Sequence, residues 1–206
     1  MSKLKRYTQL PQLLDILSTR TITVLSPASW QDRNDTYFLS RYAERKNLPG
    51  VLALCLTRAS ATYHHWYVFA SSPSGVRLEF DERQFKEWAA RIPNARLERV
   101  SYVKLGETGE GKLDADSLPF VKRHAFRDEG EVRLVVDAAY SHERARRLSF
   151  DLSLIRRIVV SPWLPNALFP AVEAAIRAAA PDVKLKIRQT TILENEEFKS
   201  AADNEA

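Results

Sequence analysis

The stretch Leu118-Pro-Phe-Val-Lys-Arg-His-Ala-Phe-Arg-Asp-Glu-Gly-Glu-Val-Arg-Leu-Val-Val136 joins a charged run to an apolar run. Residues 132–136 are apolar except for Arg133, and such a run after turn residues predicts a buried strand. A charged side chain inside a buried strand needs a partner, and the expected partner of Arg133 is a carboxylate. Glu129 and Glu131 stand where the strand begins. Burial and like-charge crowding raise a carboxyl pKa while a nearby Arg lowers it, so this position is a candidate for chemistry. The alternative is a solvated charged surface.

Hydrophobic periodicity on both sides of this stretch predicts alternating strands and helices. Further strands are expected at 4–9, 21–25, 51–57, 76–80, 97–103, 155–160 and 183–188, and helices at 11–19, 36–46, 64–69, 81–92 and 165–179. Segment 105–116 is predicted to be a mobile loop, and 138–147 a polar excursion. Because strands and helices alternate irregularly, the expected class is α+β (mixed α/β), with a central mixed sheet flanked by helices.

The size and composition of the chain indicate one domain. Residues 1–193 are expected to form it, and the acidic residues 194–206 a disordered tail. No apolar run reaches the length of a membrane helix and no signal-peptide core follows the first residues, so a cytoplasmic protein with no membrane contact is expected. Cys55 is the single cysteine and is expected to be a small buried hydrophobe. With only four histidines beside it, a structural zinc site is not expected.

The charge is distributed unevenly along the chain. The net charge is +5, but residues 194–206 carry −4, which leaves +9 on residues 1–193. A body this basic favours a polyanionic partner, either a nucleotide or a nucleic acid.

Several short pieces in a fixed order carry a resemblance to one bacterial family. They are Arg6-Tyr7, Ser26-Pro27, Trp30, Asp32, Asn34-Asp35, Cys55-Leu56-Thr57, His65-Trp66, Phe69-Ala70, Gly75, Glu79-Phe80-Asp81, Val100, Tyr102, Glu129, Glu131 and Arg133. In this order and spacing they resemble the bacterial domain of unknown function 2971 family over nearly the whole chain. Trp30-Gln31-Asp32-Arg33 departs from the commoner Phe-Asn-Asp-Pro turn, and Thr57 stands in place of the usual Ser. The family label implies no established reaction.

The order of Arg6, Thr57 and Glu131 is also similar to that of ADP-ribosyltransferases. This resemblance implies NAD as the cofactor. It implies that Arg6 binds a dinucleotide phosphate, that Thr57 or Ser60 supplies a supporting hydroxyl, and that Tyr7 or Trp66 stacks on the nicotinamide ring.

The same resemblance assigns the catalytic roles to the two glutamates. Glu131 is expected to stabilise the oxocarbenium-like charge that develops as nicotinamide leaves, and Glu129 to activate the acceptor. Lys122, Arg123 and Arg133 are expected to bind substrate or phosphate. The resemblance to the domain of unknown function 2971 family implies a setting in phage defence or a toxin–antitoxin operon, with a protein partner from the same operon.

Two other functions fit the same residues. A non-catalytic nucleic-acid-binding or regulatory module would use the clusters Lys122-Arg123 and Arg144 to Arg147. A Mg²⁺-dependent nuclease would use the oxygens of Asp32, Asp35, Glu129 and Glu131, although no metal site is predicted because nothing fixes their geometry.

Overall fold

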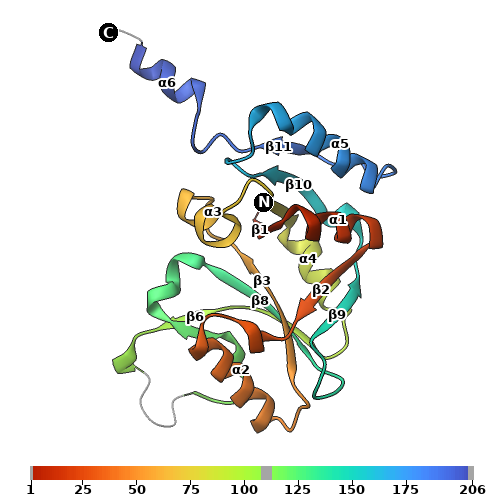
Figure 1. Ribbon diagram of the computed structural model, residues 1–206. Helices are drawn as coiled ribbons and strands as arrows, with labels where there is room; N and C mark the ends of the chain where they lie inside the picture. Colours follow the sequence, from red (N-terminus) through yellow and green to blue (C-terminus); the bar gives the residue numbers. More distant parts are fainter. Residues whose placement is uncertain (1, 108–112, 204–206) are drawn as a thin grey trace.

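A computed structural model describes residues 2–107 and 113–203 of the chain (Figure 1). The helices are α1 (Leu10–Thr19), α2 (Arg33–Arg45), α3 (Tyr63–Ala70), α4 (Glu82–Ala89), α5 (Phe169–Ala179) and α6 (Glu196–Asp203). The strands are β1 (Lys3–Gln9), β2 (Thr21–Leu25), β3 (Val51–Thr57), β4 (Gly75–Asp81), β5 (Ala95–Arg99), β6 (Ser101–Val103), β7 (Val121–Arg123), β8 (Glu131–Asp137), β9 (Ala145–Ser149), β10 (Ile155–Val160) and β11 (Ile187–Gln189). The mixed α/β class expected from the sequence is confirmed.

The centre of the fold is the antiparallel pair β3 and β8. They pair along their whole lengths, from Val51 opposite Asp137 to Thr57 opposite Glu131. Both strands are buried on two faces, as their continuous apolar runs predict, because side chains alternate between the faces and helices cover each one. Cys55 is the exception in β3, since its side chain is exposed.

The sheet divides at the other edge of β3. Since β8 occupies one edge completely, β1 and β2 share the remaining edge: β1 pairs at Thr57 and β2 at Ala53. From there β1 continues into β4, β10 and β11, and β2 continues into β9. Cys55 lies between the two pairing points, where neither neighbour covers it.

Helices cover the two faces of the nine-stranded sheet unequally. On one face, α1, α4 and α5 pack on the main core, which contains Leu4, Leu54, Leu78, Leu134 and Ile158. On the other face, α2 packs over β3 and β8, and α3 packs over β1 and β10. The helix starts follow from local chemistry, because the side chains of Asp32, Thr62 and Asp81 accept backbone N–H groups of α2, α3 and α4.

Three predicted segments differ from the structure because of pairing between distant parts of the chain. The single strand expected at 97–103 is two strands, since β5 pairs with β8 whereas β6 pairs with β7 in a separate two-stranded sheet. The polar excursion expected at 138–147 ends in β9, which pairs with β2. The last strand, expected at 183–188, is the shorter β11, parallel to β10.

Two further predicted segments lie partly outside what the structure describes. Of the predicted loop 105–116, residues 108–112 are outside the described part, and Leu105–Glu107 form a 3₁₀ helix. Within the acidic segment 194–206, expected to be disordered, Glu196–Asp203 form α6, which extends from the body (Figure 1). Among the described residues, the helices are all too short or too polar to cross a bilayer.

Candidate active site

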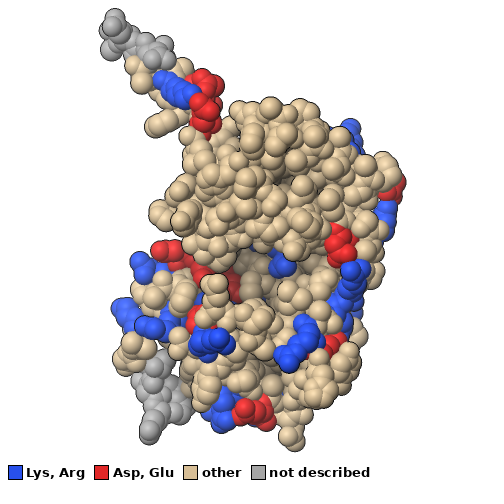
Figure 2. Space-filling view, in the orientation of Figure 1, with Lys and Arg blue, Asp and Glu red and all other residues tan. Residues whose placement is uncertain are grey.

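A cavity of about 410 Å³ opens where the sheet divides. It brings together six residues predicted from the sequence to act at one site: Arg6, Tyr7, Thr57, Lys122, Glu129 and Glu131. The remaining lining residues are Lys5, Trp30, Gln31, Asp32, Asp35, Cys55, Leu56, Val68, Phe69 and Phe126. In Figure 2 this face is hollowed below α3, and acidic and basic side chains gather around the hollow.

One wall of the cavity is built on Arg133, which is fully buried in β8. Its guanidinium donates to both carboxylate oxygens of Asp35 at 2.7 Å, and to those of Glu131 at 2.8 and 3.0 Å. It also donates to the carbonyl oxygen of Pro119 at 2.8 Å, and the Trp30 ring lies 5.2 Å from its central carbon. The prediction that Arg133 needs a carboxylate partner is confirmed. Because these contacts use the guanidinium and bury it, Arg133 does not face the cavity as a substrate contact.

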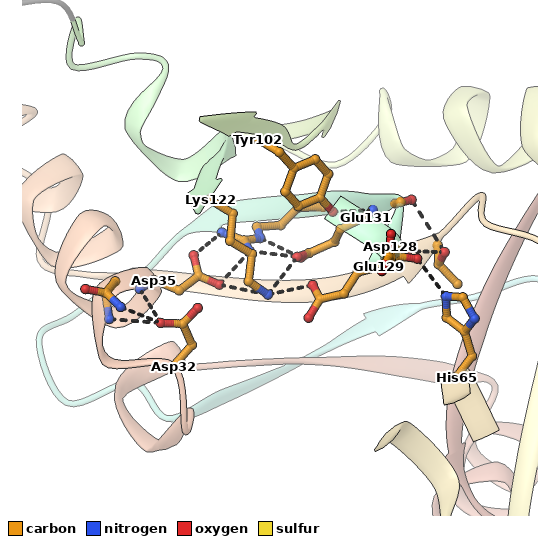
Figure 3. A network of polar contacts seen from close by, with 12 residues as sticks. Asp32, Asp35, His65, Tyr102, Lys122, Asp128, Glu129 and Glu131 are labelled. Carbon is orange, nitrogen blue, oxygen red and sulfur yellow. Dashed lines mark hydrogen bonds and ion pairs between the residues drawn. The ribbon is translucent and has the colours of Figure 1, made fainter. Parts of the chain in front are cut away.

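Lys122 contacts the same wall from the cavity side (Figure 3). Its Nζ lies 2.6 Å from Glu129, 3.5 Å from Glu131 and 3.8 Å from Asp35. Burial alone would lower the pKa of Lys122, but Glu131 and Glu129 raise it above the ordinary value. The ammonium is therefore committed to carboxylates of the protein itself.

The two glutamates of Glu129-Gly-Glu131 have pKa values shifted in opposite directions. Burial favours the neutral form of Glu131, but Arg133 and then Lys122 outweigh it and lower the pKa below the ordinary value. Burial raises the pKa of Glu129 because only Lys122 opposes it. Glu131 is thus held as a carboxylate, whereas Glu129 is the more easily protonated of the two.

The backbone conformation of Gly130 and two hydrogen bonds of Thr57 fix the turn that presents these glutamates. Gly130 adopts φ +50°, a conformation that a residue with a Cβ reaches with strain, and a Cβ there would lie 3.1 Å from Ala59. The Thr57 hydroxyl donates to the carbonyl of Glu129 and accepts the backbone N–H of Ala59. The turn is therefore tied to the end of β3.

Two more side chains hold the same turn from outside the cavity (Figure 3). His65 lies 2.9 Å through its Nε2 from the carbonyl of Asp128, and 2.6 Å through its Nδ1 from the Thr62 hydroxyl. The Tyr102 hydroxyl accepts the backbone N–H of Glu131 at 2.8 Å. Burial raises the pKa of Tyr102 to about 12, so the phenol stays neutral at physiological pH.

The opposite wall carries charge without a counter-charge. Arg6 of β1 makes one hydrogen bond, to the carbonyl of Cys55 at 3.4 Å, and within residues 2–107 and 113–203 it has no carboxylate partner. Its Nε is buried without a hydrogen-bond partner, and so is the Tyr7 hydroxyl. Burial lowers the pKa of Arg6, and the nearby Cys55 opposes this shift without outweighing it. A half-buried guanidinium that lines a cavity without a partner fits an anionic ligand.

Besides Arg133, three more of the predicted ligand contacts lie away from the cavity. Trp66 is fully buried, because α3 turns it inward against Tyr7, Ala70 and Val159, and of the two predicted stacking residues only Tyr7 lines the cavity. Ser60 is exposed and outside it. Arg123 lines a smaller neighbouring pocket of about 170 Å³.

The carboxylates of the site do not form a metal centre. Among the described residues, no group of three or more His, Cys, Asp or Glu side chains is arranged to hold a metal ion. Asp35 and Glu131 direct their oxygens at Arg133, and Asp32 caps α2. The arrangement does not support the nuclease hypothesis.

Three of the five basic side chains in the predicted clusters pair with carboxylates of the protein. Arg146 pairs with Glu143 at 2.5 Å, Arg147 pairs with Asp15 at 2.8 Å, and Lys122 belongs to the buried wall. These clusters give little support to a nucleic-acid surface.

Several lining residues and one role were not predicted from the sequence. Trp30 entered only the family pattern, and Cys55 was also expected to be buried, because nothing local indicates that the two meet at a cavity. Asp35 was considered only as a metal ligand of the nuclease alternative, although its negative charge could have identified it as the partner that Arg133 requires.

Comparison with known proteins shows a likeness of fold. No protein-family model and no curated protein matches the chain, so the resemblance to the domain of unknown function 2971 family stays a prediction. Among solved structures, Thermus sp. 2.9 DarT in complex with NAD⁺ is similar, with a TM-score of 0.50 and 11% sequence identity over 94% of this chain and 98% of that one. The same protein in complex with ADP-ribosylated ssDNA gives a TM-score of 0.49 at 12% identity, over 94% and 96% of the two chains. The chain shares the fold of DarT over nearly its whole length.

Proposed function

We propose that the chain is an ADP-ribosyltransferase-like enzyme that uses NAD⁺. The observation that carries this proposal is the cavity at the division of the sheet. There Arg6, which has no carboxylate partner among the described residues, faces a wall that holds Glu131 as a carboxylate. A dinucleotide has the matching parts, a pyrophosphate for the guanidinium and an electron-poor ribose carbon for the carboxylate. The fold shared with DarT, which has been solved with NAD⁺, supports the same substrate.

Each residue would then have a defined task. NAD⁺ supplies a glycosidic carbon–nitrogen bond whose cleavage releases nicotinamide. Arg6 binds the pyrophosphate, and Tyr7, beside it on β1, offers an aromatic face to a ring of the ligand. Glu131, fixed on two sides by Arg133 and Tyr102, stabilises positive charge on the ribose. Glu129 accepts the proton of the acceptor.

Some finer features of the proposal rest on the sequence resemblance alone. The setting in phage defence or a toxin–antitoxin operon, and a partner from that operon, follow from it. A polyanionic partner is expected from the charge of the body.

The decisive experiment measures NAD⁺ binding by calorimetry and nicotinamide release by chromatography. It compares the wild type with Arg6→Gln and Glu131→Gln, and uses Arg83→Gln as the matched control because Arg83 is exposed on α4. Binding is expected to weaken in the Arg6 variant, and release to fail in the Glu131 variant while binding persists. No binding by the wild type at millimolar NAD⁺ would refute the proposal.

A further inference from the structure

We propose that Lys122 is a positioning residue that holds the Glu129 carboxylate in the cavity as its counter-ion, and is not a contact for phosphate. The catalytic consequence of this assignment rests on the proposed function, but the assignment itself does not.

The position of Lys122 supports this role. It lies in β7, opposite Tyr102 of β6, and reaches the cavity wall with a side chain that is only 10% exposed. Its Nζ lies 2.6 Å from Glu129, and the Phe126 ring lies 4.7 Å from the same atom. Since the ammonium is enclosed by carboxylates and an aromatic ring, little of it is left for a ligand.

Arg133 and Lys122 share the three carboxylates of this wall unequally. Arg133 makes paired hydrogen bonds to Asp35 and to Glu131 and none to Glu129. In the described part of the chain, the ion pairs of Glu129 involve Lys122 alone. Removing Lys122 would leave three carboxylates beside one guanidinium. A cluster of this kind lowers its energy by taking up a proton, and Glu129 is the carboxylate without another cation.

The protonation state of Glu129 matters for the proposed transfer. As the bond between ribose C1′ and the nicotinamide nitrogen breaks, its electron pair leaves with nicotinamide. A bond forms between C1′ and the nucleophilic atom of the acceptor or of water, and the proton on that atom passes to Glu129. Only an ionised Glu129 can accept it, so Lys122 would set the lower pH limit of the reaction.

The test follows the Glu129 carboxyl by ¹³C NMR across pH, with the signal assigned from Glu129→Gln. It compares the wild type with Lys122→Met, Lys122→Arg and the control Lys46→Met, which removes a surface lysine paired with Asp116. In Lys122→Met the midpoint of the Glu129 titration should rise by about one pH unit or more. Lys122→Arg should restore it, and the control should not move it. An unchanged midpoint in Lys122→Met would overturn the proposal.

A second measurement needs no substitution of Lys122. In the wild type, the ¹⁵N signal of the Lys122 ammonium should titrate with the same midpoint as Glu129, and this step should vanish in Glu129→Gln. A Lys122 ¹⁵N signal that does not shift with the Glu129 titration would contradict the assignment, even if Lys122→Met fails to fold.

Nicotinamide release separates this proposal from the proposed function. In Lys122→Met the acidic limb of the kcat–pH profile should move to higher pH by as much as the Glu129 titration midpoint does. The KM for NAD⁺ should change less than about threefold. A large rise in KM together with an unchanged kcat–pH profile would identify Lys122 as a ligand contact instead. If the wild type releases no nicotinamide, the proposed function fails, and the two NMR titrations still decide the role of Lys122.

Discussion

The two walls of the cavity differ in whether their charged side chains have counter-ions. On the β8 wall, Arg133 and Lys122 are matched to the carboxylates of Asp35, Glu129 and Glu131 by short contacts. On the β1 wall, Arg6 has no counter-charge among the described residues, and its Nε has no hydrogen-bond partner.

This difference separates charges that hold the protein together from charges that face a ligand. A buried group with a full set of partners is costly to remove because its partners are left unpaired. A half-buried charged group without partners destabilises the folded protein. A ligand that supplies the missing partner removes this destabilisation, which favours binding. The two walls should therefore respond differently to substitution.

The largest effect is expected from Arg133→Met on the matched wall. It leaves Asp35 and Glu131 buried without their main counter-charge, so the free energy of unfolding should fall by about 3–5 kcal/mol. Urea denaturation measures this, with Arg41→Met as the control, since Arg41 pairs with Glu44 at the surface. A loss below about 1 kcal/mol would show that the wall does not depend on Arg133.

Arg6→Gln should show the reverse pattern on the unpaired wall. Losing a charge-assisted contact of about 1.5–3 kcal/mol weakens NAD⁺ binding roughly 10- to 150-fold. The free energy of unfolding should stay unchanged or rise, because the uncompensated cation is removed. Calorimetry and urea denaturation of the same sample check both parts. Marked destabilisation would mean that Arg6 is structural and that the two walls do not differ.

Acid should weaken the matched wall through Glu131. Its folded pKa lies below its ordinary value, so the unfolded chain binds more protons as the pH falls. The stability from Glu131 is therefore fully present above the ordinary value and is lost as the pH falls through the folded value. Glu131→Gln should cost about 1–2 kcal/mol at pH 7, and this difference should shrink towards pH 3. Urea denaturation at a series of pH values measures it, and a constant difference would contradict the assignment.

The smallest effect is expected where the turn joins β3. Thr57→Val removes the hydroxyl that binds the Glu129 carbonyl and should lower the free energy of unfolding by about 1 kcal/mol. Thr57→Ser keeps the hydroxyl and should cost less. Thermal unfolding of both variants checks the order. A larger loss in Thr57→Ser than in Thr57→Val would show that packing of the methyl group, which Val keeps, outweighs the hydroxyl.

The sequence predicts what depends on local pattern. Continuous apolar runs locate β3 and β8, and Arg133 inside such a run requires a carboxylate. The order of Arg6, Thr57 and Glu131 predicts residues that do line one cavity.

The remainder depends on pairing between distant segments. The cavity exists because β1 and β2 meet the same edge of β3, and no local pattern encodes a shared edge. The same absence of local signal explains why Cys55 was expected to be buried and why β9 was not predicted. For Trp66, helical spacing predicts which residues share a face of the helix, but not which face packs on the sheet. Its burial therefore follows only from the packing of α3 on the sheet.

The division of the sheet also gives the protein a built-in reporter. The only cysteine of the chain has its side chain open on the cavity floor. A thiol-reactive fluorophore would therefore attach at one known position without any engineering of the sequence. Desolvation by the surrounding protein, and then the nearby Glu131, raise the pKa of the Cys55 thiol well above its ordinary value, so labelling calls for alkaline buffer. The decrease in the labelling rate on addition of a ligand would measure occupancy of the cavity directly, whether or not the ligand reacts.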